Sequence, residues 1–236
     1  METPKYEAPE KHETTKILVG ILLFGSIWGF LEATLGGYLH FIIFPNKGAI
    51  MSGIGIAIMA SALTIYRKPA MLPFLGIVSA SHKLLDVWLF SLPVNSIHII
   101  NPAMAIIFES IAFSAVVILM QQMQRKSINS TTGIAAGVAS GLISAIAYVY
   151  FAIYVTNSPL FQRIGVNSIA EFILGPGIVQ AVFSGIFFPL GYLAGHKLYQ
   201  KPFLSPLWRG SLYYATSAAV IVFCWVIAAL AIKTGF

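Results

Sequence analysis

Long apolar runs constrain this chain more than any other feature of its sequence. Short polar joints separate seven stretches, each long enough to cross a bilayer as a helix: about 17–39, 48–66, 70–91, 101–121, 132–156, 174–196 and 211–233. A spanning helix needs about 20 mostly apolar residues, because it must satisfy its own backbone polar groups within lipid. The pattern predicts an all-α, polytopic integral membrane protein: a helical bundle of about seven transmembrane helices.

The composition agrees with lipid as the main solvent. Hydrophobic residues make up 58% of the chain and charged residues only 9%, whereas a soluble domain carries about 25% charged residues. No polar stretch in the 236 residues is long enough to form a separate soluble domain. We therefore divide the chain into a polar cytoplasmic tail (1–16), a six-helix transmembrane bundle (17–199), and a cytoplasmic loop followed by a seventh helix (200–236).

The distribution of basic residues predicts an orientation. With the N-terminus in the cytoplasm, ten of the 14 lysines and arginines fall on the inner side, three fall on the outer side, and Lys83 lies within a span. Cytoplasmic loops of membrane proteins carry such an excess of basic residues. We expect a multi-pass protein of the inner (cytoplasmic) membrane of the cell. The net charge of +6 follows from this bias, and we expect no nucleic-acid partner.

The third span carries ionisable residues that a purely structural membrane helix does not need. The stretch SASHKLLDVW (79–88) places His82, Lys83 and Asp86 within five positions. Residues three or four apart share a helical face, which predicts one compact polar face and a Lys83–Asp86 pair across one turn. Each charged group at membrane depth costs about 2.5–3.5 kcal/mol on insertion scales. The group indicates a polar cavity or, alternatively, an ion pair that only fixes packing.

Other spans place polar residues at a similar depth. At a rise of about 1.5 Å per residue, the carboxyl groups of Glu32 and Glu109 fall in the outer half of the bilayer, as do Lys83 and Asp86. An outward-facing pocket is predicted from these residues and two neighbours, with the substrate-binding set Glu32, His82, Lys83, Asp86, Asn101 and Glu109. Three carboxylates against one lysine require a bound cation or a proton for charge balance.

Two glycine-containing segments predict irregular helix ends near this pocket. The first apolar stretch is longer than a bilayer requires, so either its helix tilts or, as we favour, it breaks at the Gly36–Gly37 pair and residues 38–44 lie in the outer interface. The segment AEFILGPGIVQ (170–180) predicts a broken start of the sixth span. Irregular backbone at membrane depth is tolerated where it lines a cavity, so we expect this second segment to line the mouth of the pocket.

The histidines and carboxylates leave several chemistries open. His40, His82 and His98 are candidate ligands of a divalent metal, because imidazole suits such ions, although no close pair such as H-x-x-x-H is present. Two facing histidines could instead hold a haem. The pocket carboxylates could serve an intramembrane enzyme, but the sequence contains no recognisable hydrolase or nucleotide-binding motif. The sequence names no cofactor and favours a transport or membrane-subunit role over an enzyme.

A stripe of small residues marks the first span. Gly25, Gly29, Ala33 and Gly37 recur every four residues, a spacing that lets transmembrane helices approach closely. With six basic-flanked spans, an inside N-terminus and an outward pocket, residues 17–199 resemble the substrate-capture (S) subunit of energy-coupling factor transporters. The resemblance implies capture of a vitamin-like molecule or a metal ion, with the stripe docking a membrane coupling subunit that works with ATPases. The seventh span is an addition to that six-helix pattern.

Two functions from different classes follow. The first is a membrane protein that binds a small solute in an outer-half pocket for uptake, together with an energising partner. The alternative is a membrane anchor subunit of a redox complex that binds haem or quinone. Absorption in the Soret region and copurified ATPase subunits are the observations that separate them.

Overall fold

The computed structural model describes residues 10–41, 46–124, 130–159, 165–201 and 210–234, and every regular element in them is helical. The elements are α1 (Glu10–Phe41), α2 (Lys47–Tyr66), a 3-10 turn (Pro69–Met71), α3 (Leu72–Ser81), α4 (Leu84–Phe90), α5 (Ile97–Gln124), α6 (Ser130–Tyr154), α8 (Ile169–Phe172), a π-helical turn (Ile173–Gly177), α9 (Ile178–Tyr199) and α10 (Gly210–Thr234). The all-α prediction is confirmed.

Within these residues, seven helical segments are long and apolar enough to cross a membrane. They are Glu13–Leu39, Lys47–Tyr66, Pro69–Phe90, Ile97–Met123, Thr131–Tyr154, Ile169–Tyr199 and Gly210–Thr234. Each overlaps one of the seven predicted spans, so the prediction of a seven-span membrane protein is confirmed. The third segment contains the 3-10 turn, α3 and α4, and the sixth contains α8, the π-helical turn and α9.

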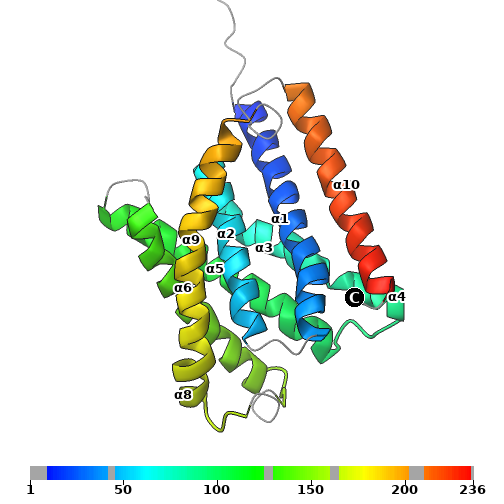
Figure 1. Cartoon of the computed structure of the whole chain (residues 1–236), viewed down its shortest axis with the longest axis vertical. Helices are drawn as coiled ribbons and strands as arrows, with labels where there is room; N and C mark the ends of the chain where they lie inside the picture. The colour runs from blue at the N-terminus through cyan, green and yellow to red at the C-terminus, as the bar shows by residue number, and fades with distance from the viewer. Residues whose placement is uncertain (1–9, 42–45, 125–129, 160–164, 202–209, 235–236) are drawn as a thin grey trace, which may run out of the picture.

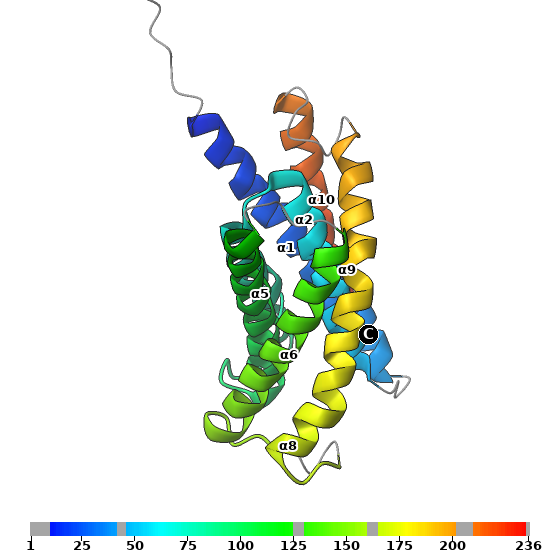
Figure 2. The same ribbon diagram turned by 90° about the vertical axis from the view of Figure 1, so that its left-hand side faces the viewer.

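The helices form one bundle with α10 at its side (Figures 1 and 2). Helix α2 lies along α9, α6 packs between α9 and α5, and α3 packs between α1 and α5. Helix α10 packs on α1 and touches α4, and in Figure 1 it lies on the side of α1 away from α9. The seventh span is therefore a peripheral addition to the other six.

Small residues bring the helices together, while large apolar side chains cover the outside. At the α2–α9 contact, a side chain at Gly191 would collide with the backbone of Ala57. The hydroxyl of Ser61 donates to the carbonyl oxygen of Gly191 at 2.8 Å. On the surface, Phe74 and Phe223 are each more than half exposed. Small residues inside and large ones outside are the usual arrangement in lipid, which does not drive helices together hydrophobically.

Helix α1 does not break at Gly36–Gly37, and this prediction was wrong. The helix continues to Phe41, and it begins at Glu10, before the predicted end of the polar tail at residue 16. A glycine in a helix costs about 1 kcal/mol relative to alanine, whereas each backbone group left unsatisfied in lipid costs several. Gly36 also lies in a packed place, since a Cβ there would be 3.8 Å from Cε of Met51 on α2.

The third span is broken where a continuous helix was predicted. Helix α3 ends at Ser81, His82 and Lys83 form a turn, and α4 begins at Leu84. The amide of His82 donates to Ser79 O at 3.1 Å and that of Lys83 to Ala80 O at 3.0 Å. These i to i−3 hydrogen bonds are the tight pattern of a 3-10 turn. They interrupt the helix at His82 and Lys83, two of the ionisable residues of this span.

Candidate solute-binding pocket

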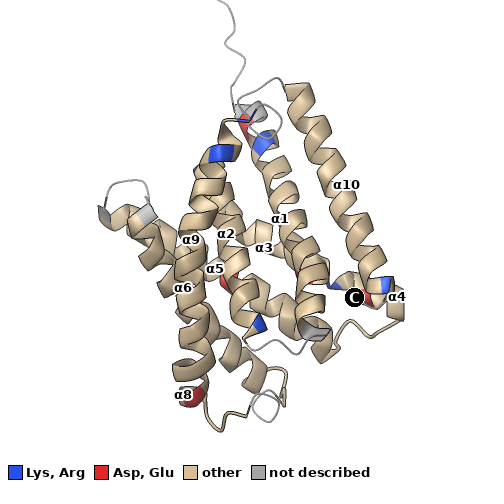
Figure 3. Ribbon diagram, in the orientation of Figure 1, with Lys and Arg blue, Asp and Glu red and all other residues tan. Residues whose placement is uncertain are grey.

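A pocket of about 1010 Å³ lies in the half of the bundle opposite the start of α1. Its walls come from the last third of α1, the start of α2, the α3–α4 turn, the first half of α5, the end of α6 and the beginning of the sixth span. All six residues predicted to bind substrate line it: Glu32, His82, Lys83, Asp86, Asn101 and Glu109. Figure 3 shows few charges between the two ends of the bundle other than this group. The structure brings the predicted residues together, and their role in binding stays a prediction.

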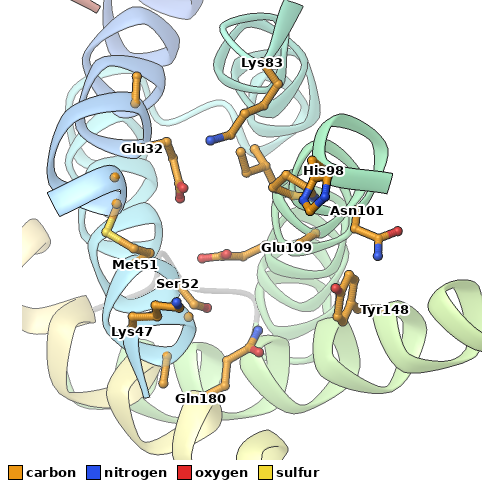
Figure 4. Close-up of a pocket in the computed structure, with 18 of the residues that line it drawn as sticks. Glu32, Lys47, Met51, Ser52, Lys83, His98, Asn101, Glu109, Tyr148 and Gln180 are labelled. Carbon is orange, nitrogen blue, oxygen red and sulfur yellow. The ribbon is translucent and has the colours of Figure 1, made fainter. Parts of the chain in front are cut away.

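Two carboxyl groups from different helices face the same space. Glu32 projects from α1 and Glu109 from α5, and Figure 4 shows their oxygens pointing toward one another across the pocket. Glu32 Oε1 accepts a hydrogen bond of 3.3 Å from the indole nitrogen of Trp28, whose side chain is completely buried. The two carboxyl groups therefore line one shared space from two different helices.

Glu109 is the most deeply buried acidic group of the pocket. Its side chain is only 5% exposed, and within the described residues its Oε1 has no hydrogen-bond partner. The carboxyl group is hydrogen-bonded to Ser52, but a buried carboxyl oxygen that is left without a partner is unfavourable. An unpartnered buried polar group in a pocket wall marks a place where a ligand can supply the missing interaction.

Lys83 extends toward Glu32 and does not pair with Asp86. No nitrogen–oxygen distance of 4.0 Å or less joins Lys83 to an acid among the described residues, where the ion pair found is Lys68–Glu13, at 3.3 Å. The ammonium group interacts electrostatically with both Glu32 and Asp86, and Figure 4 shows it pointing into the pocket. The predicted Lys83–Asp86 ion pair was therefore wrong, because the charged groups of the two side chains do not come within 4.0 Å of one another.

His82 forms part of the wall between the pocket and α10. Its side chain is 1% exposed and its ring lies 3.9 Å, centre to centre, from that of Trp225. Nδ1 lies 3.2 Å from the carbonyl oxygen of Val78, while Nε2 has no partner within the described residues. The ring occupies the space left by the missing side chain of Gly29 on α1. Close packing against Trp225 and Gly29 therefore holds the His82 ring in place.

Two neutral amide side chains, those of Asn101 and Gln180, also line the pocket. Asn101 donates to Ser158 Oγ at 3.0 Å and accepts from Thr156 Oγ1 at 3.1 Å, so it ties α5 to the end of α6. Gln180 donates to Ser144 Oγ at 3.0 Å. The amide of Gln180 is held by a residue of α6, and that of Asn101 by two residues of the turn that follows α6, so both groups are oriented at the pocket wall.

The broken start of the sixth span lines the pocket, as the sequence predicted. Phe172, Pro176 and Gln180 all contribute to the wall, and the π-helical turn Ile173–Gly177 joins α8 to α9. Phe172 is paired with Tyr148 of α6, with ring centres 6.4 Å apart. The irregular backbone thus borders the cavity through Pro176, as is tolerated at membrane depth.

Sequence reasoning missed several polar members of the wall, and Lys47, Ser52 and Tyr148 are three of them. Lys47 was counted only as an outer-loop charge, but it is the first residue of α2 and lines the pocket. Ser52 and Tyr148 also line it. Both lie inside apolar runs that carry no signal of their own, and only the rotation of α2 and α6 in the bundle turns them inward.

The candidate metal ligands do not form a metal site in the part of the chain that the structure describes. No group of three His, Cys, Asp or Glu side chains there could hold an ion. His82 is packed against Trp225, and His98 is an exposed residue at the start of α5. The side chain of His40 lies outside the described residues.

The small-residue stripe of α1 is used inside the chain. A Cβ at Gly25 would lie 2.6 Å from Val78, and Gly29 accommodates His82. Ala33 is buried in a cluster with Ala228 and Ile232 of α10, and Gly37 lines the pocket. This corrects the prediction of a docking stripe, because α3 and α10 already cover the face intended for a partner helix.

The pocket combines a few charged side chains with apolar walls. Its described charged residues are three carboxylates and two lysines, set among apolar walls and oriented amides. Ligand sites of about 300–1,000 Å³ with a few placed polar groups are typical of drug-sized molecules. In comparisons with protein-family models, curated proteins and solved structures, nothing matches this chain, so its interpretation rests on this geometry.

Proposed function

We propose that this chain is a solute-binding protein of the cytoplasmic membrane, which captures a small organic molecule in the pocket as a step in its uptake. The observation that carries the proposal is the convergence of Glu32, Lys83 and Glu109, from three separate spans, on one cavity of about 1010 Å³. Ionisable residues at membrane depth are costly and mark substrate or ion pathways. A bundle stabilised only by packing would not need them.

The position of the pocket supports capture from outside. Arg67, Lys68 and Lys197 lie at the end of the bundle where α2 and α9 finish, whereas the pocket is formed at the other end. If the basic end is cytoplasmic, as the positive-inside rule predicts, the pocket belongs to the outer half. Solute then reaches it without crossing the membrane first.

An energising partner is part of the proposal. The sequence contains no nucleotide-binding motif, so energy for uphill uptake would come from another subunit, as the resemblance to substrate-capture subunits of energy-coupling factor transporters implies. The covered face of α1 means that such a subunit would contact a different surface. The exposed apolar residues of α9, such as Ile186 and Leu193, offer one.

Retained ligand provides the direct test. The protein is purified gently, denatured, and its released small molecules are identified by mass spectrometry. We expect one molecule enriched in the wild type and depleted in Glu109→Gln, with Glu13→Gln as the matched control because Glu13 is an exposed acid in an ion pair with Lys68. Equal profiles for all three proteins, with no uptake of any enriched compound by intact cells, would reject solute capture.

One observation favours the redox-anchor alternative. The imidazole of His82 is buried at the pocket wall with a free Nε2 within the described residues, and a neutral imidazole nitrogen is a haem ligand. The visible spectrum of the purified protein separates the alternatives. A Soret band lost in His82→Gln would favour the anchor, and its absence from protein that retains an organic solute would favour capture.

A further inference from the structure

The charges of the pocket point to the class of its solute, an inference that rests on the proposed function. We propose that the pocket binds an organic cation, whose protonated amine or amidine group lies between Glu32 and Glu109. The rest of the molecule would lie along the wall formed by Tyr148 and Phe172. The observations that lead to this class are the facing carboxyl groups, the charge balance of the wall, and its aromatic side.

The two glutamates make a site for one positive group. They come from α1 and α5 and point into the same space (Figure 4), where two ionised carboxylates would repel one another. The side chain of Glu109 is only 5% exposed, and within the described residues its Oε1 has no hydrogen-bond partner. A donor with positive charge would relieve the repulsion and supply charge-assisted hydrogen bonds, which are stronger than neutral ones.

The resident lysines do not complete the charge balance. Among the residues that the structure describes, the lining has three carboxylates, Glu32, Asp86 and Glu109, against two ammonium groups, Lys47 and Lys83, a formal excess of one negative charge. Lys83 acts on Glu32 and on Asp86 at once. One further positive charge would therefore make the pocket neutral, which favours a monocation over a zwitterion or an anion.

The geometry favours an organic cation over a metal ion. The described residues contain no three-ligand group for a metal, and a volume of about 1010 Å³ far exceeds what a single ion needs. Tyr148 and Phe172 lie with ring centres 6.4 Å apart on the wall. Aromatic side chains bury large apolar area and contact other rings favourably, so the uncharged part of the solute is expected to be apolar or aromatic.

A matched series of ligands tests the charge. Equilibrium binding is measured for naphthylethylamine, its neutral alcohol naphthylethanol, and the anion naphthylacetate, with protein in a maltoside detergent that has no cationic headgroup. We expect the amine to bind at least about tenfold more tightly than the other two, as one charge-assisted hydrogen bond would provide. Tighter or equal binding of the alcohol or the anion would overturn the proposal that the solute is a cation, while leaving the proposal of a solute pocket in place.

Substitutions of the two glutamates test where the amine binds. Glu109→Gln and Glu32→Gln are each expected to weaken amine binding about tenfold and to leave the alcohol unchanged, because glutamine keeps the shape and removes the charge. Glu32→Gln retains an oxygen for Trp28, so it carries the test if Glu109→Gln does not fold. Glu13→Gln, at the other end of the bundle, is the control. An amine affinity that neither pocket variant changes would overturn the site, and failure of all three ligands to bind at millimolar concentration would count against the solute pocket itself.

Discussion

Glu109 of α5 packs against Gly55 of α2. A Cβ at position 55 would lie 2.8 Å from Glu109 Oε1 and 2.5 Å from Cζ2 of Trp28, closer than side-chain carbons approach other atoms. The glycine therefore provides the space in which the buried carboxyl group and the indole lie. Because Trp28 also donates to Glu32, this one contact joins both pocket glutamates to the packing of three helices.

Gly55→Ala is expected to disturb the pocket from behind. The added methyl group must displace Glu109 or Trp28, and overpacking of this kind costs about 1–3 kcal/mol of stability. We expect a lower melting temperature and weaker binding of naphthylethylamine. Gly48→Ala is the control, because Gly48 also lines the pocket but a Cβ there meets nothing within 4 Å. Identical melting curves and affinities for the two variants would contradict the packing argument.

Lys83→Met should change affinity and stability in opposite directions. Loss of the ammonium group removes repulsion of a bound cation, which we expect to raise amine affinity about fivefold. The same loss leaves Glu32 and Asp86 without their shared positive neighbour, so the ligand-free protein should melt at a lower temperature. Binding titrations and thermal unfolding measure the two effects. Weaker amine binding in this variant would show that Lys83 contacts the ligand favourably instead.

Trp225→Leu is expected to loosen α10. Trp225 packs on His82 and donates to Ser26 Oγ at 3.1 Å, so its removal should cost about 1–3 kcal/mol. Trp88→Leu is the matched control, since Trp88 is 87% exposed and its loss should leave the melting temperature unchanged. If loss of the exposed Trp88 lowered the melting temperature as much as loss of the partly buried Trp225, the contact between α10 and the third span would not contribute measurably.

Cysteine labelling tests the orientation. In a Cys224→Ala background, Asn95→Cys should react with a membrane-impermeant thiol reagent in intact cells, and Gln200→Cys should react only after the membrane is opened. Both positions are exposed and lie at opposite ends of the bundle, so burial does not explain a difference between them. The reverse pattern would place the N-terminus outside and the pocket on the cytoplasmic side.

The sequence by itself determined the spans and the level of the polar group. Bilayer thickness requires about 20 apolar residues per helix, so hydropathy along the chain is enough to place seven spans. The rise per residue then sets the depth of each charge. For this reason Glu32, Asp86 and Glu109 could be assigned to one pocket before any helix was packed, and all three line it.

Only the tertiary structure decided how the helices turn and what each side chain meets. Three features depend on residues of other helices: the turn at His82–Lys83, the direction of Lys83 toward Glu32 and the packing of His82 on Gly29. The spacing of these residues along their own helices allows several partners. Tyr148 and Ser52 carry no signal in an apolar run, and the rotation of α6 and α2 made them part of the wall. Depth is a property of one segment and its solvent, whereas contact is a property of two segments, and local sequence does not determine how these segments pack.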